Sequence, residues 1–504
     1  MRAKIKGMRP RIWLILIVQA ALVSGTVLAV ASRRVPLGVP GEWEWLRVKF
    51  PPVWQWLGLA GLAVVAYSGF VAVGFKAIAT RSSRRVEAVW LAGLAAAAVA
   101  IQVTIPLGAA SGYDHSKWAA ANYLPGSAGY FKIARQQALR DPWRFLADYP
   151  RWIEDQDSLH IGTHPPGLIA VQCFLIRLMD SQPSLADFLL DHMPAAVDQG
   201  FRVFAVHDPQ PLSRADRAAL YATALLTLFA CALTVVPLYL LARVALPGRP
   251  AWAAAALWPL VPAANLFQPV ADTAYPLPST SALALAAWSA WLFARSGRPA
   301  YVAVLLAIAS GTVMAFGMFF TLAFLPVGLI VALVVASQRT LSWRSRGLVI
   351  GGIGLGFTLV VLCGWAGLGA NPFVIGWWNL HHHARFYDEY PRTYWLWLVV
   401  NPVELAIALG LPAVVWCLSG LFLPRGMPMS VWATILVLVL TNLTGRNMGE
   451  VARLWLLYLP PLLVGAGYGF DRWASRPAAL GVSTALLGLQ TLGLQAMIQV
   501  VYPV

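Results

Sequence analysis

The sequence predicts an all-α polytopic membrane protein, from its composition, the length of its apolar runs and the placement of its positive charges. Of the 504 residues, 59% are hydrophobic and only 12% are charged, and the mean hydropathy is +0.66. Soluble globular domains do not have this balance. Apolar runs close to the roughly 20 residues that a helix needs to cross the hydrocarbon core recur along most of the chain.

By this length criterion the chain contains about 13 candidate transmembrane helices. They are expected at 12–31, 54–75, 88–110, 217–242, 251–267, 277–294, 300–316, 318–336, 347–368, 396–421, 428–443, 454–470 and 478–500. Residues 1–87 would then hold two N-terminal transmembrane helices. Residues 88–504 would form a membrane-embedded core that includes a long loop at 111–216.

The positive charges predict how these helices are oriented. Lys and Arg gather in residues 1–11 and in the loops at 76–85, 243–249, 295–298, 339–346, 425 and 472–476. Since short cytoplasmic loops are enriched in Lys and Arg, these segments and the N-terminus are expected in the cytoplasm. The segments 111–216, 267–276, 369–395 and 442–453 would face the outer side of a plasma (inner) membrane. The loop 32–53 fits least well, because it carries four Lys and Arg residues on the predicted outer side.

The net charge of +16 does not indicate a nucleic-acid partner, because its distribution follows the loops. Residues 111–216 carry nine Lys and Arg against 12 acidic residues, whereas the rest of the chain carries 28 against nine. The excess therefore reports topology and contact with anionic membrane lipids. The four cysteines are scattered through apolar surroundings and are expected to be buried apolar side chains.

Residues 111–216 form the one long polar interval of the chain, with 12 of its 21 carboxylates and five of its eight histidines. The apolar run 166–179 within it has about 14 residues, too few to span comfortably. We expect this run to be a juxtamembrane helix that begins at a Pro-Pro pair, and residues 184–206 to form a second such element. Counting 166–179 as a span would invert every later loop.

Two carboxylates on the predicted outer face could carry acid–base chemistry. Asp114, between Tyr113 and His115, directly follows a predicted span, and a partly desolvated carboxylate there could act as a general base. The simpler interpretation is a helix-end residue in water. Asp272 lies in a turn between two spans, where a lone carboxylate is costly unless it reaches water, a cation or a pocket. The two could converge on one site, with or without a divalent metal ion.

Several cationic and aromatic residues on the same face could bind an anionic ligand. His164 precedes Pro165 and Pro166, which restrict its backbone and would aim its ring reproducibly. Adjacent histidines point in different directions, so the 381–383 run favours phosphate binding or interfacial anchoring over a metal site. The candidate binding residues of this group are His382, His383, Arg385, Tyr387, Arg446, Glu450 and Arg453. Glu450 with Arg446 or Arg453 could also be a structural ion pair.

These motifs together resemble the GT-C superfamily of membrane glycosyltransferases, especially protein O-mannosyltransferases and lipid A aminoarabinose transferases. Tyr113-Asp114-His115 matches the acidic opening of the family's first outer loop, and His164-Pro165-Pro166 matches its later motif. Asp272 occupies the place of the second acidic residue, and residues 449–455 are similar to a segment of bacterial members. The resemblance covers roughly residues 88–470. It departs from the family in lacking an Asp-Glu pair and in having two extra spans before the core.

The resemblance implies transfer of a sugar, with inversion, from a polyprenyl-phosphate-linked donor to a hydroxyl of a lipid, glycan or protein acceptor. Asp114 would act as the base, and Asp272 would orient the acceptor or hold a divalent metal ion, with no other cofactor implied. The cations that stabilise the departing phosphate would come from His164, His382, Arg385 and either Arg446 or Arg453. The alternative is a transporter or flippase of a lipid-linked glycan, which should carry ionisable groups in mid-membrane and broken helices in related halves.

Overall fold

The computed structural model describes residues 9–78, 83–124, 128–207, 210–295, 300–423 and 426–499. The structure is 77% helical, which confirms the all-α prediction. The strands in these residues are two-residue pairs: β1 (Gly38–Val39) with β2 (Trp43–Glu44), and β3 (Leu46–Arg47) with β4 (Ile498–Gln499), both antiparallel. Residues 1–8, Arg81, Arg298 and Arg425, on which the orientation prediction also drew, lie outside the described residues.

The helices follow one another along the whole chain. The first are α1 (Arg9–Ser32), α2 (Trp54–Ala77), α3 (Arg84–Thr104), α4 (Lys117–Ala121), α5 (Tyr130–Ile133), α6 (Pro142–Trp152), α7 (Gly167–Ser181), α8 (Pro183–Asp191), α9 (Ala195–His207), α10 (Arg214–Leu233), α11 (Val235–Ala245) and α12 (Gly248–Leu257). The others are α13 (Pro262–Leu266), α14 (Pro276–Phe293), α15 (Ala300–Met318), α16 (Phe324–Ala336), α17 (Trp343–Leu368), α18 (Pro372–Glu389), α19 (Tyr394–Leu409), α20 (Leu411–Leu421), α21 (Met429–Leu443), α22 (Val451–Leu454), α23 (Leu459–Trp473) and α24 (Pro477–Met497). Short 3-10 or π segments are η2 (Ile105–Gly108), η3 (Ala134–Ala138), η4 (Ile153–Asp155), η5 (Trp258–Leu260), η6 (Ala271–Thr273) and η7 (Leu456–Tyr458).

Seven helical segments in the described residues are long and apolar enough to cross a membrane, or eight if the bent pair α19 and α20 is one span. They are Ile12–Ser32, Trp54–Ala77, Arg84–Gly108, Arg214–Ala245, Ala300–Met318, Trp343–Leu368 and Pro477–Met497. The predicted number of 13 is not confirmed. The run 251–267, for example, is split into α12, η5 and α13 because Pro259 and Pro262 interrupt it.

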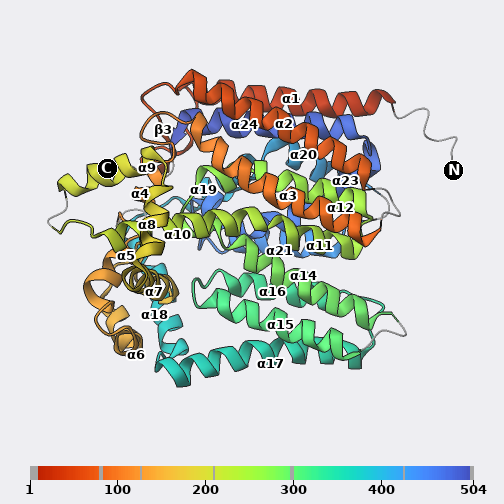
Figure 1. Cartoon of the computed structure of the whole chain (residues 1–504). Coiled ribbons are helices and arrows are strands. Elements are labelled where there is room, and N and C mark those ends of the chain that lie inside the picture. The colour runs from red at the N-terminus through yellow and green to blue at the C-terminus, as the bar shows by residue number, and fades with distance from the viewer. Residues whose placement is uncertain are drawn as a thin grey trace.

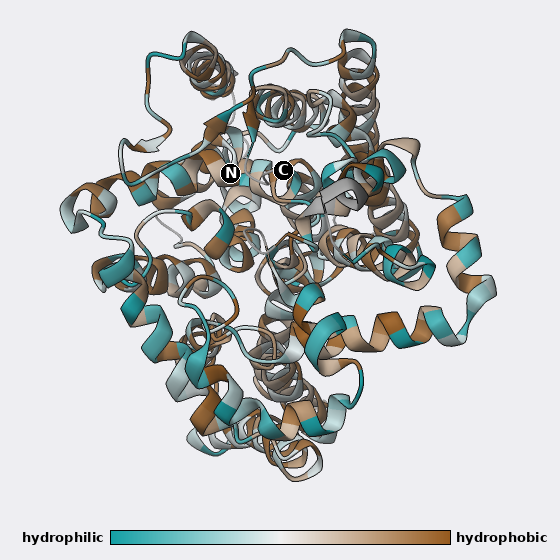
Figure 2. Ribbon diagram, turned by 90° about the vertical axis from the view of Figure 1, so that its left-hand side faces the viewer, coloured by the Kyte–Doolittle hydropathy of each residue, from teal (hydrophilic) through white to brown (hydrophobic). Residues whose placement is uncertain are grey.

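The long helices run side by side, and the helices of the 111–216 segment, α4 to α9, gather with α18 at one end of the bundle (Figure 1). Figure 2 looks onto this end and shows hydrophilic residues spread over its helices and loops. Helix α7 has 15 residues and is not among the candidate spans, as predicted for the 166–179 run. The element expected at 184–206 is two helices, because Pro194 lies between α8 and α9.

The segments predicted to share the outer side contact one another. The 32–53 loop reaches the 369–395 segment, where Thr393 N donates to Glu42 at 3.0 Å. The 111–216 segment reaches the same region, where Ser158 Oγ donates to Glu389 at 2.6 Å. The end of the chain joins them through the pairing of β3 with β4. These loops therefore form one polar end of the molecule.

Predicted cytoplasmic segments meet in the same way at their own end. Arg243 forms an ion pair with Glu87 at 3.4 Å, and Arg249 Nε donates to the carbonyl of Ile78 at 3.2 Å. The two ends of the bundle are thus distinct. Which compartment each end faces stays a prediction.

Close approach between helices depends on glycine. A Cβ on Gly311 of α15 would collide with the backbone of Ile353, and one on Gly356 of α17 with the backbone of Ile308. Small residues let helix backbones approach within a membrane, where apolar surface alone gives little preference for one partner over another. The close packing of α15 against α17 therefore depends on the absence of side chains at Gly311 and Gly356.

Candidate functional site

A cavity of about 680 Å³ lies at the polar end, where the 111–216 segment and α18 meet the spans. Its lining comes from five stretches of the chain: 128–168, 270–275, 321–329, 379–392 and 437–458. Seven of the 12 candidate residues line it, namely His164, Asp272, His383, Tyr387, Arg446, Glu450 and Arg453. The fold thus brings together residues that are up to 289 positions apart, from His164 to Arg453.

Glu450 joins two arginines at the wall of this cavity. It caps α22 with a left-handed backbone, φ 57°, and its Oε2 accepts from Arg453 at 2.6 Å. Its Oε1 lies 3.7 Å from the guanidinium of Arg392. Burial acts to lower the pKa of Arg453, but the carboxylates of Glu450 and Asp272 outweigh it and raise that pKa above its usual range. Arg453 is therefore a fixed cation.

Asp272 lies in η6, between α13 and α14, and faces the same cavity. Burial raises the pKa of its carboxyl group, and the nearby Arg453 guanidinium partly opposes this effect. A carboxyl group with a raised pKa accepts a proton more readily than a solvated one does, which suits a general base.

His164 is a neutral hydrogen-bonding group. Its Nδ1 lies 2.9 Å from the carbonyl of His160 and 3.0 Å from Thr163 Oγ1. A carbonyl only accepts, so Nδ1 carries a proton and donates it to this bond. Burial lowers the pKa of His164 to about 3. A neutral His164 gives no support to the expectation that it supplies a cation for a phosphate, although it does line the cavity.

His383 and Tyr387 lie one turn apart on α18 and face the cavity. The Tyr387 hydroxyl donates to the carbonyl of Arg446 at 2.9 Å and accepts from Met448 N at 2.8 Å. Burial lowers the pKa of His383, and the Arg446 cation lowers it further. Tyr387 thus ties α18 to the loop that carries Arg446.

Helix α19 is hydrogen-bonded to the loop that carries Arg446. Asn401 Nδ2 donates to the carbonyl of Asn447 at 2.7 Å, and its Oδ1 accepts from Gly449 N at 3.1 Å. Glu404 Oε1 accepts from Ala452 N at 3.0 Å. Both side chains are buried. Sequence reasoning left this role unassigned, although polar residues inside the apolar run 396–421 were a signal for it.

The cavity also has an apolar part between α16 and α21. Its lining there includes Leu325, Pro326 and Leu329 of α16, and Val437 and Leu440 of α21. Leu325, Leu329 and Leu440 are 52%, 45% and 45% exposed, so this wall reaches the outer surface of the helix bundle. One cavity therefore joins a charged end to an apolar, laterally exposed side.

Asp114 belongs to a separate cluster and, like Tyr113 and His115, is not among the cavity-lining residues. Asp114 Oδ1 accepts from the backbone N of Ser116 at 2.9 Å, and buried His115 contacts a carbonyl of α3 at 2.8 Å. Lys117, which sequence reasoning missed, is buried and donates to a carbonyl of α13 at 3.0 Å. Burial lowers the pKa of Lys117 to about 7, against the effect of Asp114. The role of Asp114 as base stays a prediction.

His382 and Arg385 also lie away from the lining. His382 is 1% exposed, its Nε2 lies 2.9 Å from the carbonyl of Ile153, and its ring stacks on Trp378. Arg385 forms an exposed ion pair with Glu389 at 3.0 Å. Their expected contact with a ligand gains no support, because His382 is used in packing α18 against η4 and Arg385 is turned to another helix face.

The described residues contain no group of three or more His, Cys, Asp or Glu side chains that could hold a metal ion. Asp114 and Asp272, the expected ligands, also do not line the same cavity. The structure therefore gives these two expected ligands no shared site, and the divalent ion stays an expectation.

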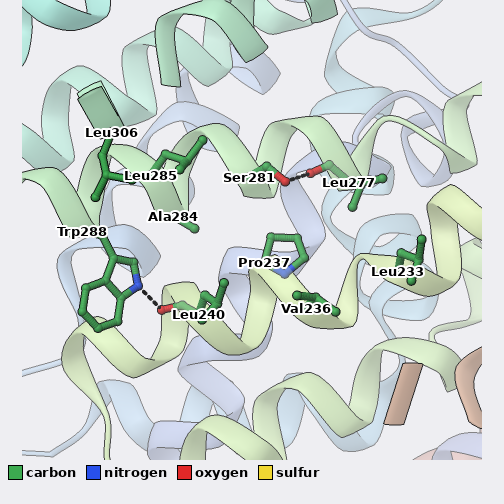
Figure 3. A pocket seen from close by; sticks show the side chains of 10 residues that line it. All are labelled: Leu233, Val236, Pro237, Leu240, Leu277, Ser281, Ala284, Leu285, Trp288 and Leu306. Atoms are coloured by element: carbon green, nitrogen blue, oxygen red, sulfur yellow. Dashed lines mark hydrogen bonds between the residues drawn. The ribbon is translucent and has the colours of Figure 1, made fainter. Parts of the chain in front are cut away.

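A second cavity, of about 620 Å³, lies between α11 and α14, with Leu306 of α15 beside it (Figure 3). Its polar side chains are already paired: Trp288 Nε1 donates to the carbonyl of Leu240, and Ser281 Oγ to that of Leu277. The rest of its lining is apolar. It is an apolar groove between helices with no group available for chemistry.

No protein-family model matches this chain, and no curated protein matches it in sequence.

Proposed function

We propose that this protein is a membrane glycosyltransferase that moves a sugar from a polyprenyl-phosphate-linked donor to an acceptor hydroxyl, with inversion. The observation that carries the proposal is one cavity that has arginine side chains at one end and an exposed apolar wall along α16 and α21. A lipid-linked sugar phosphate has the same division into an anionic head and an apolar chain. The expected location is the outer face of the plasma membrane.

The donor phosphate would lie against the arginines of the cavity. Arg453 is a fixed cation, and Arg446 and Arg392 line the same wall. Guanidinium groups bind phosphate oxygens with paired donors and stay charged at every working pH. In the proposed reaction, negative charge grows on this phosphate as it leaves, and preplaced cations lower the barrier.

Asp272 is the proposed base. The acceptor oxygen attacks the anomeric carbon and forms the new C–O bond, while the bond from that carbon to the phosphate oxygen breaks and its electron pair leaves with the phosphate. The acceptor proton passes to Asp272, whose raised pKa favours that step. Neutral His164 and Tyr387 would hold sugar hydroxyls. Asp114, the base that the resemblance implies, stays a second candidate.

A transfer assay with a labelled polyprenyl-phosphate sugar tests the proposal. We expect Asp272→Asn and Arg453→Ala each to lower the transfer rate about 100-fold or more, because each removes a group that acts on developing charge. Arg144→Ala is the matched control, since Arg144 is 81% exposed on α6. Loss of transfer in Asp114→Asn with full turnover in Asp272→Asn would move the base to Asp114.

The flippase alternative keeps one observation in its favour. Helices α19 and α20 form a broken span, bent by 109° at Gly410, and broken helices are typical of transporters. The buried Glu404 in α19, however, is bonded to the backbone of the 446–453 loop. Movement of the labelled lipid across a vesicle membrane without any sugar transfer would favour the flippase.

A further inference from the structure

The loop between the two N-terminal spans reaches the candidate site. Residues 38–44 form the β1–β2 hairpin, and Glu42 at its turn contacts the start of α19. One Glu42 oxygen accepts from Thr393 Oγ1 at 2.6 Å, and the other accepts from Trp397 Nε1 at 2.6 Å. The backbone N of Thr393 donates to both. These partners lie 351 and 355 positions from Glu42 along the chain.

The residue next to Thr393 belongs to the cavity wall. Arg392 is largely buried, and its NH1 donates to the carbonyl of Met448 at 2.7 Å. Its guanidinium also lies 3.7 Å from Glu450 and 5.5 Å from the ring centre of Trp397. Both donors to Glu42 are therefore close to Arg392: Thr393 follows it directly in sequence, and the ring of Trp397 lies against its guanidinium.

Glu42 is held as a carboxylate. Burial acts to raise its pKa, but the hydrogen bonds from Thr393 and Trp397 outweigh that effect and lower the pKa below its usual range. Trp43, beside it on β2, packs against Trp397 with ring centres 6.3 Å apart. The hairpin thus meets α19 through an ionised acceptor and an aromatic contact.

We propose that Glu42 is a positioning residue, through which the two N-terminal spans fix Arg392 and the 446–453 loop at the cavity. Its contacts run from Glu42 to Thr393 and Trp397, then through Arg392 to Met448 and Glu450. The structural claim stands on these contacts alone, while its consequence for turnover rests on the proposed function. It gives the N-terminal spans a role in the site rather than in anchoring only.

Hydrogen exchange of the full-length protein in lipid nanodiscs tests this role without any substrate. In Glu42→Gln, one acceptor oxygen replaces two, and the amide N–H groups face other donors. We expect backbone exchange in 391–397 and 445–453 to become about tenfold faster, with other segments unchanged. Glu44→Gln removes the same charge two residues away and should exchange like the wild type.

Two outcomes overturn the proposal: wild-type exchange at 445–453 in Glu42→Gln, or an equal increase throughout the protein, which would indicate general destabilisation. Trp397→Phe is the second variant, because it removes one donor to Glu42 and keeps an aromatic ring. It should speed exchange in the same two segments, and wild-type exchange there would also count against the proposal. Once transfer activity is established, Glu42→Gln should also lower kcat, by a factor similar to the increase in exchange at 445–453. An unchanged kcat would show that the Glu42 contact does not affect turnover.

Discussion

At Asp272, burial and a nearby guanidinium act in opposite directions on one carboxyl group. Burial disfavours the charged form and raises the pKa, and Arg453 lowers it only in part. The folded protein therefore holds this proton to a higher pH than the unfolded chain does. Burying a carboxylate in this way destabilises its charged form, and carboxyl groups with such raised pKa values are typical of sites that need a proton acceptor.

The same shift makes a prediction about stability. The pKa of Asp272 is higher in the folded state than in the unfolded state, where it is about 4, so the folded state binds more protons between these two pKa values. The free energy of unfolding therefore falls as the pH rises from about 4 through the folded-state pKa. Asp272→Asn removes the buried charge, so its unfolding temperature should exceed that of the wild type at pH 7. Thermal unfolding monitored in detergent between pH 3 and 8 measures the difference.

The difference between the two proteins should shrink as the pH falls, since protonated Asp272 is neutral like asparagine. Asp148→Asn on exposed α6 is the control and should show little dependence. A variant less stable than the wild type at pH 7 would mean that the attraction between Asp272 and Arg453 outweighs the cost of burial.

The sequence predicted which residues belong to the candidate site better than it predicted their protonation states and hydrogen-bond partners. His164 was placed in the site by its Pro-Pro neighbours, and it does line the cavity. Its neutral form depends on burial and on the His160 carbonyl, which only the folded chain shows. Asp114 and Asp272 looked equivalent as outer-face carboxylates, but the fold separates them. Asp272 lines the cavity, whereas Asp114 does not and accepts from the backbone N of its neighbour Ser116.

At the scale of elements, helical periodicity decides which polar residues can reach a ligand. Along α18, Asn379, His383 and Tyr387 line the cavity at intervals of four. His382 falls on another face and is buried against η4. The sequence predicted that adjacent histidines point in different directions. Which of them faces the cavity depends on where the 111–216 segment packs against α18, and this is known only from the structure.

Packing of α15 against α17 makes the prediction that belongs to this scale. Gly356→Leu would push a side chain into the backbone of Ile308, and we expect it to destabilise the protein by about 1–3 kcal/mol or to force the helices apart. Gly354→Leu is the matched control, because a Cβ at Gly354 meets nothing within 4 Å. Thermal unfolding and size-exclusion profiles of the two variants measure the effect.

Equal stability of the two variants would show that α17 is not held by this contact. A larger loss for Gly354→Leu would indicate that the face of α17 carrying Gly354 packs against a second copy of the chain.

At the scale of the molecule, the pattern of the loops was predictable and the number of spans was not. Apolar runs and cations grouped the loops into two sets, and the contacts of Glu42, Ser158 and Glu87 fall within those sets. The length criterion predicted too many spans, because an apolar helix that is buried among other helices need not cross the membrane by itself. Helix α12 has 10 residues and α23 has 15, and both are almost wholly buried, so neighbouring helices rather than lipid surround them.

The sidedness of the polar end is the prediction for the whole molecule. The 32–53 loop carries more cations than an outer loop should, yet it contacts the 369–395 segment directly. Contact outweighs the charge rule here, because segments bonded to each other cannot lie on opposite sides of a bilayer. Exposed Lys49, Asp148 and Tyr390 should therefore be accessible from one side, and exposed Arg339 from the other.

Single-cysteine variants at these four positions test this arrangement. Cys363 is exposed, contrary to the prediction that all four cysteines are buried, so it is replaced by serine in the background. A membrane-impermeant maleimide added to intact cells should label positions 49, 148 and 390, and should label 339 only after permeabilisation. If 339 alone were labelled on intact cells, the arrangement would hold with inverted orientation, and the cavity would open to the cytoplasm. If 49 and 390 were labelled from opposite sides, the shared polar end would be wrong, and the hydrogen bonds from Thr393 and Trp397 to Glu42 could not form in the membrane.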